Sequence, residues 1–597
     1  MQRYSVNQQL VGTILSWVKA EEIAVPEMQR PFVWDATKVR DLMDSLYKGF
    51  PVGYLIVWKN PDVNLKDGTT SEGKKILIDG QQRVTALEAA ILGEKVMNKD
   101  YRWVNINIAF NPITEKFEVS NPAIEKDETW LPNISEIFSS KNNFLDTVDR
   151  YFEKNNSLID KNLLYQRLDH LSKLVDKQIG LIELDSDLDI EDVTEIFIRI
   201  NSEGVVLGQS DFVMSKIAAS TKYDGPTLRK AIDYFCHLAI APEFYADLIE
   251  VDNEFTNTDY FSKMAWLKDE KDDLYDPDYT DLIRVSFTKE FERGKLSDLV
   301  SLLSGRNFET RKFEEEIAED SFNRLKKSIM DFMNETNFQR FVMIIKSAGF
   351  ISSSMIRSQN TLNFAYIIYL KLKEKGYNPE DIEHYVKRWF VMSILTGRYS
   401  GSPESKFDFD IKNIVENKFG DYLTNIENAD LSEAFWDAAL VQNLNTPVSS
   451  SPYFNVFLAA QVKNNDRGFL SKDIKINDLI THRGDIHHIF PREYLKSKGL
   501  GKSKYNQIAN YVYMQTETNI KVGKKAPNVY FKEIKEQVES GKSKYGGIKD
   551  IQDLKRNLRA NCIPLKIFEM DVDSYEEFLE LRRKSMAEKI HKYYLSL

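Results

Sequence analysis

The chain has 597 residues, an ordinary balance of apolar and charged side chains, and too much length for a single hydrophobic core. Its net charge of −11 argues against a general nucleic-acid coat, although it leaves room for local basic surfaces. The two cysteines, Cys236 and Cys562, exclude a disulfide framework and a cysteine-based zinc site, and they fit a reducing cytoplasm. Residues 1–7 lack a signal pattern and no apolar run could cross a bilayer, so we expect a cytoplasmic protein without membrane contact.

Residues 1–222 predict alternating strands and helices. Short apolar runs at residues 54–58, 75–78 and 180–184 predict buried strands. Apolar residues at helical spacing from Arg83 to Leu92, followed by a glycine, predict a capped helix, and a second helix is expected over residues 191–200.

A strand–turn–helix junction carries the first chemical signal, in the sequence Asp-Gly-Gln-Gln-Arg at residues 79–83. A glycine lets the backbone approach a ligand closely, and free N–H groups at a helix start suit a phosphate. Arg83 could add a bidentate contact. An Asp-Gly turn closed by an arginine–carboxylate pair would use the same residues, so the residues alone leave both interpretations open.

Two more segments, at residues 26–34 and 196–204, are rich in polar groups. Together with residues 79–83 they resemble the N-terminal domain of modification-dependent, type IV restriction systems of the GmrS/GmrD kind, whose Asp-Gly-Gln-Gln-Arg core lies on a ParB/sulfiredoxin-like fold. The resemblance implies nucleotide binding and NTP hydrolysis. It implies the following pocket: Asp79, Gly80, Gln81, Gln82 and Arg83 around the phosphates, with Gln29, Arg30, Arg199 and Asn201 lining the same site.

Residues 223–442 predict a mainly helical domain, with core-facing helices at 364–370 and 386–391. The Arg-Tyr pair in the loop at residues 397–405 could contact a base or a phosphate, or it could belong to an ordinary interhelical loop. A polar, proline-containing stretch at residues 443–451 predicts a linker into a last domain, residues 443–597.

The most informative segment is Gly-Asp-Ile-His-His-Ile-Phe-Pro at residues 484–491, followed by Asn510 and Asn519. One imidazole can deprotonate a water, and nearby nitrogen and oxygen ligands can hold a cation against a phosphate. Ligands without thiolates favour Mg²⁺ or Mn²⁺. The alternative is a pair of structural histidines with incidental asparagines.

This pattern is similar to the ββα-metal (His-Asn-His) nucleases, in the branch fused to the N-terminal domain above. The resemblance implies that His488 is the general base and that Asn510 orients its loop. It implies metal ligation by His487 and Asn519, with Asp485 as a further ligand, although the family usually has an acidic residue at position 487. Residues 492–549 contain thirteen Lys or Arg against five Asp or Glu. Among them, Lys521, Lys524 and Lys525 are expected to face DNA.

The sequence therefore predicts a multidomain α+β protein with a ParB/sulfiredoxin-like N-terminal domain (residues 1–222), a helical coupling domain (223–442) and a C-terminal ββα-metal nuclease with a helical surround (443–597). Its expected function is NTP-dependent, Mg²⁺- or Mn²⁺-assisted cleavage of double-stranded, modified phage DNA. An NTP-responsive nucleic-acid sensor with an inactive nuclease and a metal-dependent RNase toxin are the alternatives. The DNA modification, the preferred NTP, nicking against double-strand cleavage, and homodimer formation stay open.

Overall fold

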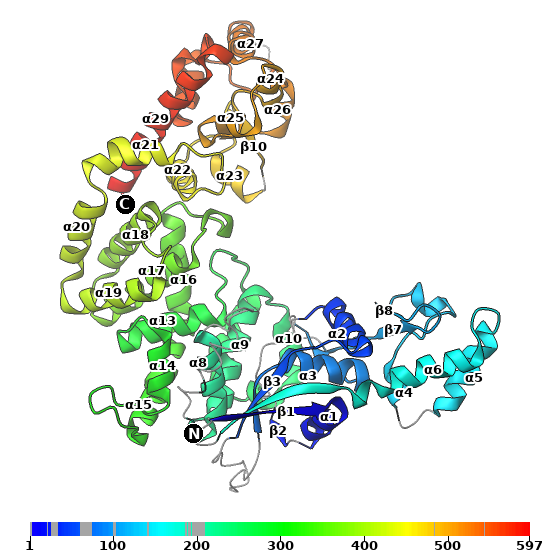
Figure 1. Cartoon of the computed structure of the whole chain (residues 1–597). Helices are drawn as coiled ribbons and strands as arrows, with labels where there is room; N and C mark the ends of the chain where they lie inside the picture. The colour runs from blue at the N-terminus through cyan, green and yellow to red at the C-terminus, as the bar shows by residue number, and fades with distance from the viewer. Residues whose placement is uncertain are drawn as a thin grey trace. The chain divides into compact units, whose positions relative to one another are not determined.

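The structure is a computed structural model that describes residues 3–20, 22–24, 34–59, 75–98, 103–139, 143–185, 188, 193, 209–482, 484–541 and 544–597. The chain separates into two compact units, Met1–Arg229 with Phe308–Phe313, and Lys230–Asn307 with Glu314–Leu597 (Figure 1). The first boundary lies near the predicted residue 222, whereas the predicted boundary at residue 443 lies inside the second unit.

A five-stranded mixed sheet organises the first unit, in the order β1-β9-β3-β4-β2. Strands β3 and β9 run parallel, as do β2 and β4, while β1 pairs with β9 and β3 pairs with β4 in antiparallel fashion. The three predicted strands are confirmed. The bounds are β1 Tyr4–Leu10, β2 Ile23–Ala24, β3 Tyr54–Lys59, β4 Lys75–Asp79 and β9 Gln178–Leu184.

Apolar side chains alternate between the two faces of this sheet, as the pleat requires. On one face Leu55, Val57 and Leu77 pack in a core shared with the first three helices. On the other face Ile56 and Leu184 join a smaller apolar cluster. The helices and remaining strands of this unit are α1 Val11–Lys19, α2 Ala36–Lys48, α3 Gln81–Leu87, α4 Ser135–Phe138, α5 Phe144–Asn155, α6 Lys161–Ser172, α8 Gln209–Ala219, β5 Val96–Met97, β6 Trp103–Val104, β7 Ile108–Asn111 and β8 Lys116–Val119.

The predicted helix over residues 83–92 is confirmed with one irregularity. The α-helix α3 passes into a π-helical turn, η1 (Glu88–Leu92), before Gly93 ends it with φ of +69°. Positive φ costs glycine little, so the sequence signal for this cap was local and clear. The expected helix over residues 191–200 lies outside the described residues apart from Val193.

Helices dominate the second unit, and the predicted segments at 364–370 and 386–391 lie in α17 and α18. Their aromatic side chains are core, since Tyr366 packs on Phe341 with ring centroids 4.7 Å apart. The helices before residue 443 are α9 Gly225–Ile240, which starts in the first unit, α10 Phe244–Val251, α11 Asn253–Thr256, α12 Asp259–Met264, α13 Tyr279–Phe291, α14 Leu296–Leu303, α15 Glu315–Met333, α16 Glu335–Ser347, α17 Gln359–Glu374, α18 Pro379–Thr396, α19 Pro403–Glu416, α20 Phe419–Asp430 and α21 Leu440–Asn443.

The Arg-Tyr pair after α18 forms hydrogen bonds in the interior of the protein. The Arg398 guanidinium donates two hydrogen bonds to Asp410, at 2.8 and 2.6 Å, and the Tyr399 hydroxyl donates to the same carboxylate at 2.8 Å. Asp410 is completely buried and Arg398 nearly so. Removing one partner of such a pair typically costs about 3–5 kcal/mol. The structure therefore supports an interhelical loop here and gives no sign of a surface for bases or phosphates.

The C-terminal part of the second unit contains a small two-stranded sheet among helices. Within the described residues, no helix is both long and apolar enough to span a membrane. The bounds are α22 Pro452–Lys463, α23 Ile476–Thr481, β10 Ile486–His488, α24 Arg492–Ser497, α25 Lys502–Tyr505, β11 Tyr511–Tyr513, α26 Thr516–Val522, α27 Pro527–Ser540, α28 Ile551–Ala560 and α29 Tyr575–Leu595.

Candidate functional site

The predicted histidine pair lies on a two-stranded antiparallel ribbon. Strand β10 pairs with β11 so that His487 faces Val512 and His488 faces Tyr511 across the ladder. Helix α26 begins three residues after β11. The order strand, strand, helix is the one that the His-Asn-His resemblance implies, while a complete ββα-metal fold stays a prediction.

The ring of His488 is held on two sides. Its Nε2 lies 3.0 Å from the side-chain oxygen of Asn506, and the ring meets Tyr511 edge-on, with centroids 5.1 Å apart. Burial lowers the pKa of His488, the hydrogen bond with Asn506 raises it, and the charges of Arg492 and His487 lower it, so that the net shift is downward. A lowered pKa keeps the imidazole neutral near pH 7, which is the form that can accept a proton.

Asn510 fixes the chain that follows His488. Its side-chain oxygen accepts from the Phe490 N–H at 2.8 Å, and its amide nitrogen donates to the carbonyls of Phe490 and Tyr505 at 3.1 and 3.2 Å. The residue is completely buried, so these bonds are shielded from water. The contacts fit the predicted orienting role and leave the amide committed to backbone groups.

Three side chains that the sequence did not single out brace the same loop. The hydroxyl of Tyr530 donates to the Ile489 carbonyl at 2.9 Å, and that of Tyr575 donates to the Lys504 carbonyl at 3.1 Å. Arg582 donates to the Ala509 carbonyl at 2.9 Å. These partners are 41, 71 and 73 residues apart in sequence, so spacing within the motif could not reveal them.

Arg582 is unusual because it is completely buried and forms no ion pair within the described part of the chain. Its second hydrogen bond goes to the Asn561 carbonyl at 3.3 Å. Burial lowers the pKa of this guanidinium to about 10. A charged group is costly to bury. Because Arg582 is buried and donates to backbone carbonyls, we infer that it fixes the backbone conformation of the histidine loop.

His487 and Asp485 are the predicted metal-side residues. The Nε2 atom of His487 is buried without a hydrogen-bond partner. Burial lowers the pKa of His487, and the nearby charge of Asp485 raises it. An orphaned, buried ring nitrogen beside a carboxylate fits a cation ligand, since buried polar atoms otherwise find partners.

Few side chains near the histidines could serve as metal ligands. No group of three or more His, Cys, Asp or Glu side chains suited to a metal occurs among the described residues, so the amide of Asn519 would have to contribute. Asn519 is the fourth residue of α26. Successive side chains on a strand point to opposite faces, so His487 and His488 leave β10 on different sides.

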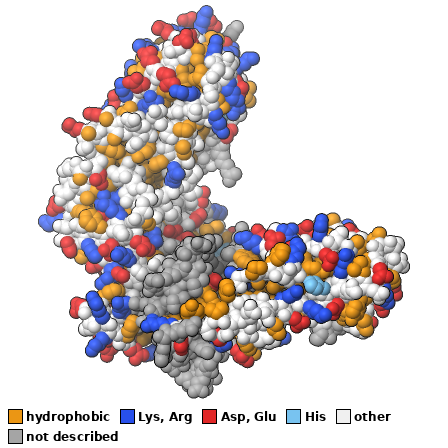
Figure 2. Space-filling model, viewed as in Figure 1, with side chains coloured by type: hydrophobic (Ala, Val, Ile, Leu, Met, Phe, Trp, Pro, Cys, Tyr) orange, Lys and Arg blue, Asp and Glu red, His pale blue; other side chains and the backbone are white. Residues whose placement is uncertain are grey.

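The predicted DNA-facing lysines differ from one another. Lys521 and Lys524 are exposed, whereas the ammonium of Lys525 contacts the Glu533 carboxylate at 2.8 Å and the Tyr545 hydroxyl at 2.7 Å. Burial tends to raise the pKa of Glu533, but hydrogen bonds, first from Lys525, outweigh it and lower the pKa to about 2. On the face drawn in Figure 2, Lys and Arg side chains are interspersed with Asp and Glu over this part of the chain.

In the first unit, the predicted junction is a tight corner between β4 and α3. Gly80 has φ of +94° and starts the helix. The Arg83 guanidinium donates to the Tyr54 carbonyl at 2.5 Å and lies 3.9 Å from the Asp79 carboxylate. A side chain at Gly53 or Gly80 would approach this guanidinium within 3.2 Å. Arg83 thus closes the corner through a backbone carbonyl and is only loosely paired with Asp79.

The neighbouring glutamines are also engaged. The Gln81 amide donates to the Leu77 carbonyl at 3.0 Å, and the Gln82 oxygen accepts from the Trp34 N–H at 3.3 Å. The other predicted pocket residues lie outside the described residues, so the structure places no contact for them: Gln29, Arg30, Arg199 and Asn201.

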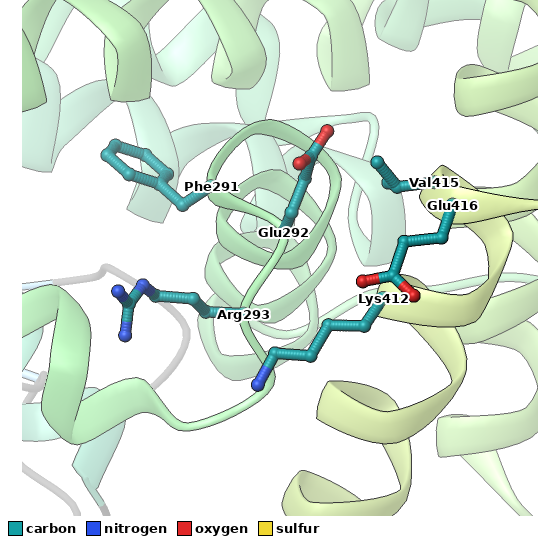
Figure 3. A pocket seen from close by; sticks show the side chains of 6 residues that line it. All are labelled: Phe291, Glu292, Arg293, Lys412, Val415 and Glu416. Carbon is teal, nitrogen blue, oxygen red and sulfur yellow. The ribbon is translucent and has the colours of Figure 1, made fainter.

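A separate hollow of about 280 Å³ lies between α13 and α19 (Figure 3), lined by Phe291, Glu292, Arg293, Lys412, Val415 and Glu416. Three of its charged side chains pair with residues beside it: Glu292 with Lys371, Arg293 with Asp298, and Lys412 with Asp408. None of the lining residues comes from the histidine ribbon, and we assign it no chemistry.

Comparison with known proteins adds two findings. An uncharacterized protein of Methanocaldococcus jannaschii, MJ0686, is 24% identical over 634 residues, which cover 95% of this chain and 96% of the relative. Both units therefore have a counterpart in that protein. Residues 11–218 match the family described as the GmrSD restriction endonuclease, N-terminal domain. This match contains the Asp-Gly-Gln-Gln-Arg corner and relates the N-terminal third of the chain to the GmrSD restriction endonucleases.

Proposed function

We propose that this protein is a metal-dependent DNA endonuclease of the type IV restriction kind, in which His488 is the general base. The carrying observation is the imidazole of His488 held by Asn506, on a loop whose backbone is fixed by the buried Asn510. The relation of the N-terminal third to restriction endonucleases supports DNA as the substrate. Modified phage DNA is the substrate class that this kind of enzyme implies.

The chain's own residues supply proton transfer and positioning. His488 takes a proton from the attacking water, because its lowered pKa leaves the ring neutral at physiological pH. Asn510 and Tyr530 hold the backbone beside it, which keeps the ring in place during the reaction. His487, Asp485 and Asn519 would hold Mg²⁺ or Mn²⁺. When bound, such an ion offsets the charge that develops on the phosphate.

The N-terminal unit would bind an NTP and control cleavage. The corner at Gly53, Gly80 and Arg83 supports this role, since two glycines leave a guanidinium face close to the backbone. Arginine is well suited to phosphate oxygens. The ParB/sulfiredoxin-like fold, NTP hydrolysis, homodimer formation and the identity of the DNA modification belong to the same proposal.

The decisive experiment is digestion of a panel of modified phage DNAs with Mg²⁺ or Mn²⁺, with and without each NTP. His488→Ala should abolish cleavage and leave NTP hydrolysis intact. The matched control is His482→Ala, because His482 lies in the same segment but is exposed and bonds only the Asp478 carbonyl among the described residues. Full cleavage by His488→Ala would overturn the assignment.

The two alternatives are separate outcomes of the same assay. Chelator-insensitive DNA binding without cleavage under every metal and NTP would favour a sensor with an inactive nuclease. Cleavage of RNA in parallel reactions, with plasmid and phage DNA left intact, would favour an RNase toxin.

A further inference from the structure

We propose that Asn506 is a positioning residue that fixes the tautomer of His488, with the proton on Nε2 and the lone pair on Nδ1. The inference rests on the proposed function for its catalytic consequence, but the tautomer itself is a property of the folded protein. It assigns the proton-accepting atom to Nδ1 of His488.

The contact defines the tautomer. The side-chain oxygen of Asn506 lies 3.0 Å from Nε2 of His488. An amide oxygen can accept a hydrogen bond but cannot donate one, so Nε2 must carry the proton. In a neutral imidazole the other ring nitrogen, Nδ1, is then unprotonated and can accept a proton from water.

The other nitrogen of the ring is accessible. Nδ1 of His488 has no hydrogen-bond partner among the described residues, and it is not fully buried. It therefore reaches solvent. In the neighbouring histidine, by contrast, the Nε2 atom of His487 is buried and has no hydrogen-bond partner. Of the two rings, only that of His488 combines a held nitrogen with an open one.

The position of Asn506 is itself fixed from both sides. Asn506 directly follows α25, and its backbone N–H donates to the Lys502 carbonyl at 3.1 Å. The preceding carbonyl, that of Tyr505, accepts from Asn510 at 3.2 Å and from the Tyr575 hydroxyl at 3.4 Å. The amide oxygen of Asn506 is thus presented to His488 by a rigid turn, which is how an outer residue can orient a reactive ring.

The test compares Asn506→Asp with Asn506→Ala in the full chain. The aspartate keeps an oxygen acceptor for Nε2–H and the alanine removes it. Ring-¹⁵N-labelled histidine in the solid state reports the tautomer directly, and the chain has only seven histidines. Subtraction of the His488→Gln spectrum isolates the signals of His488. Gln507→Ala is the control, because that neighbouring amide donates to the Ser503 carbonyl and not to the ring.

We expect wild type and Asn506→Asp to show the Nε2–H form at alkaline pH, and Asn506→Ala to show a mixture of tautomers. With DNA as substrate, Asn506→Ala should lower kcat about 10- to 100-fold with little change in KM, and Asn506→Asp should retain more activity than the alanine variant. An Nδ1–H form in wild type would overturn the inference, as would an unchanged tautomer and kcat in Asn506→Ala. If wild type cuts no nucleic acid but Asn506→Ala still scrambles the tautomer, the proposed function has failed and the positioning contact stands.

Discussion

In both the histidine loop of the second unit and the arginine corner of the first unit, side chains fix the backbone through hydrogen bonds to its carbonyl and N–H groups. The two regions differ in whether the proposed functional side chain is itself one of those that fix the backbone. In the loop, the backbone around His488 is fixed by other side chains, chiefly Asn510, Tyr530 and Arg582. At the corner, Arg83 is both the proposed phosphate ligand and the group that ties α3 to the Tyr54 carbonyl.

The difference predicts how mutations will behave. Where scaffold and reactive group are separate residues, activity can be removed without loss of stability. Where one side chain has both roles, every substitution changes ligand binding and stability together. The following variants test this contrast.

The largest effect is expected for His488→Gln. General-base catalysis contributes about 10²- to 10⁴-fold, so the cleavage rate should fall by that factor. The backbone ties of the loop do not involve this side chain, so Tm should stay close to that of wild type. Parallel cleavage kinetics and thermal unfolding measure both, and a large drop in Tm would show that the ring is part of the scaffold.

Asn510→Ala should have a different signature. It leaves the N–H and the carbonyl of Phe490 without this partner, and each buried unsatisfied group costs about 1–3 kcal/mol. We expect a clear loss in the free energy of unfolding together with loss of cleavage. Urea unfolding checks the first effect. A stable variant that still cuts DNA would contradict the scaffold role.

Arg83→Lys should weaken nucleotide binding and stability in parallel. A lysine keeps the charge but not the planar fork, and the lost hydrogen bond to the Tyr54 carbonyl is worth about 1 kcal/mol. Calorimetric titration with each NTP and thermal unfolding provide the two measurements. Arg40→Lys is the control, since Arg40 forms a partly exposed pair with Asp41 on α2. Unchanged nucleotide affinity would remove Arg83 from the pocket.

The smallest effect concerns two adjacent lysines. Lys524→Ala should weaken DNA binding and flatten its salt dependence, because Lys524 is exposed. Lys525→Ala should act mainly on stability, because its ammonium is already held by Glu533 and Tyr545. DNA affinity at two salt concentrations distinguishes them, and equal losses for both variants would contradict the distinction.

The same cluster gives a pH prediction. The pKa of Glu533 is lowered to about 2 in the folded chain, below the ordinary value of about 4.3. Its contribution to stability is therefore present above the ordinary value and is lost as the pH falls through the lowered one. Thermal unfolding of wild type and Glu533→Gln in acidic buffers should converge as the pH falls. Parallel curves would rule out this contribution.

The sequence predicted those helices and strands whose signals lie within a short stretch of residues. The strands at residues 54–58 and 75–78 and the glycine cap at residue 93 all depend on neighbouring residues. The order of the strands in the sheet could not be predicted, because β1 pairs with β9, and Tyr4 lies opposite Leu184, which comes 180 residues later. Nothing in either strand alone specifies that partner.

The candidate site divides in the same way. His488 and Asn510 were predicted from the resemblance of the motif, but Asn506 was passed over although it lies between them. Its side-chain direction depends on the turn after α25, which is fixed in turn by Tyr575 from far along the chain. The choice between a surface role and a buried ion pair for Arg398 also required the fold, because its partner Asp410 comes from the next helix, α19.

The last helix, α29, contacts two separate parts of the second unit. One end touches the histidine loop, where Arg582 meets the Ala509 carbonyl, and the other end touches the helical part of the unit, where Tyr593 donates to the Ala348 carbonyl and Tyr594 to Glu427 at 2.5 Å. An α-helix turns about 100° per residue. Inserting or deleting a single residue between positions 582 and 593 would rotate one end away from its seat, so α29 should tolerate substitutions at its exposed positions far better than any change in its length.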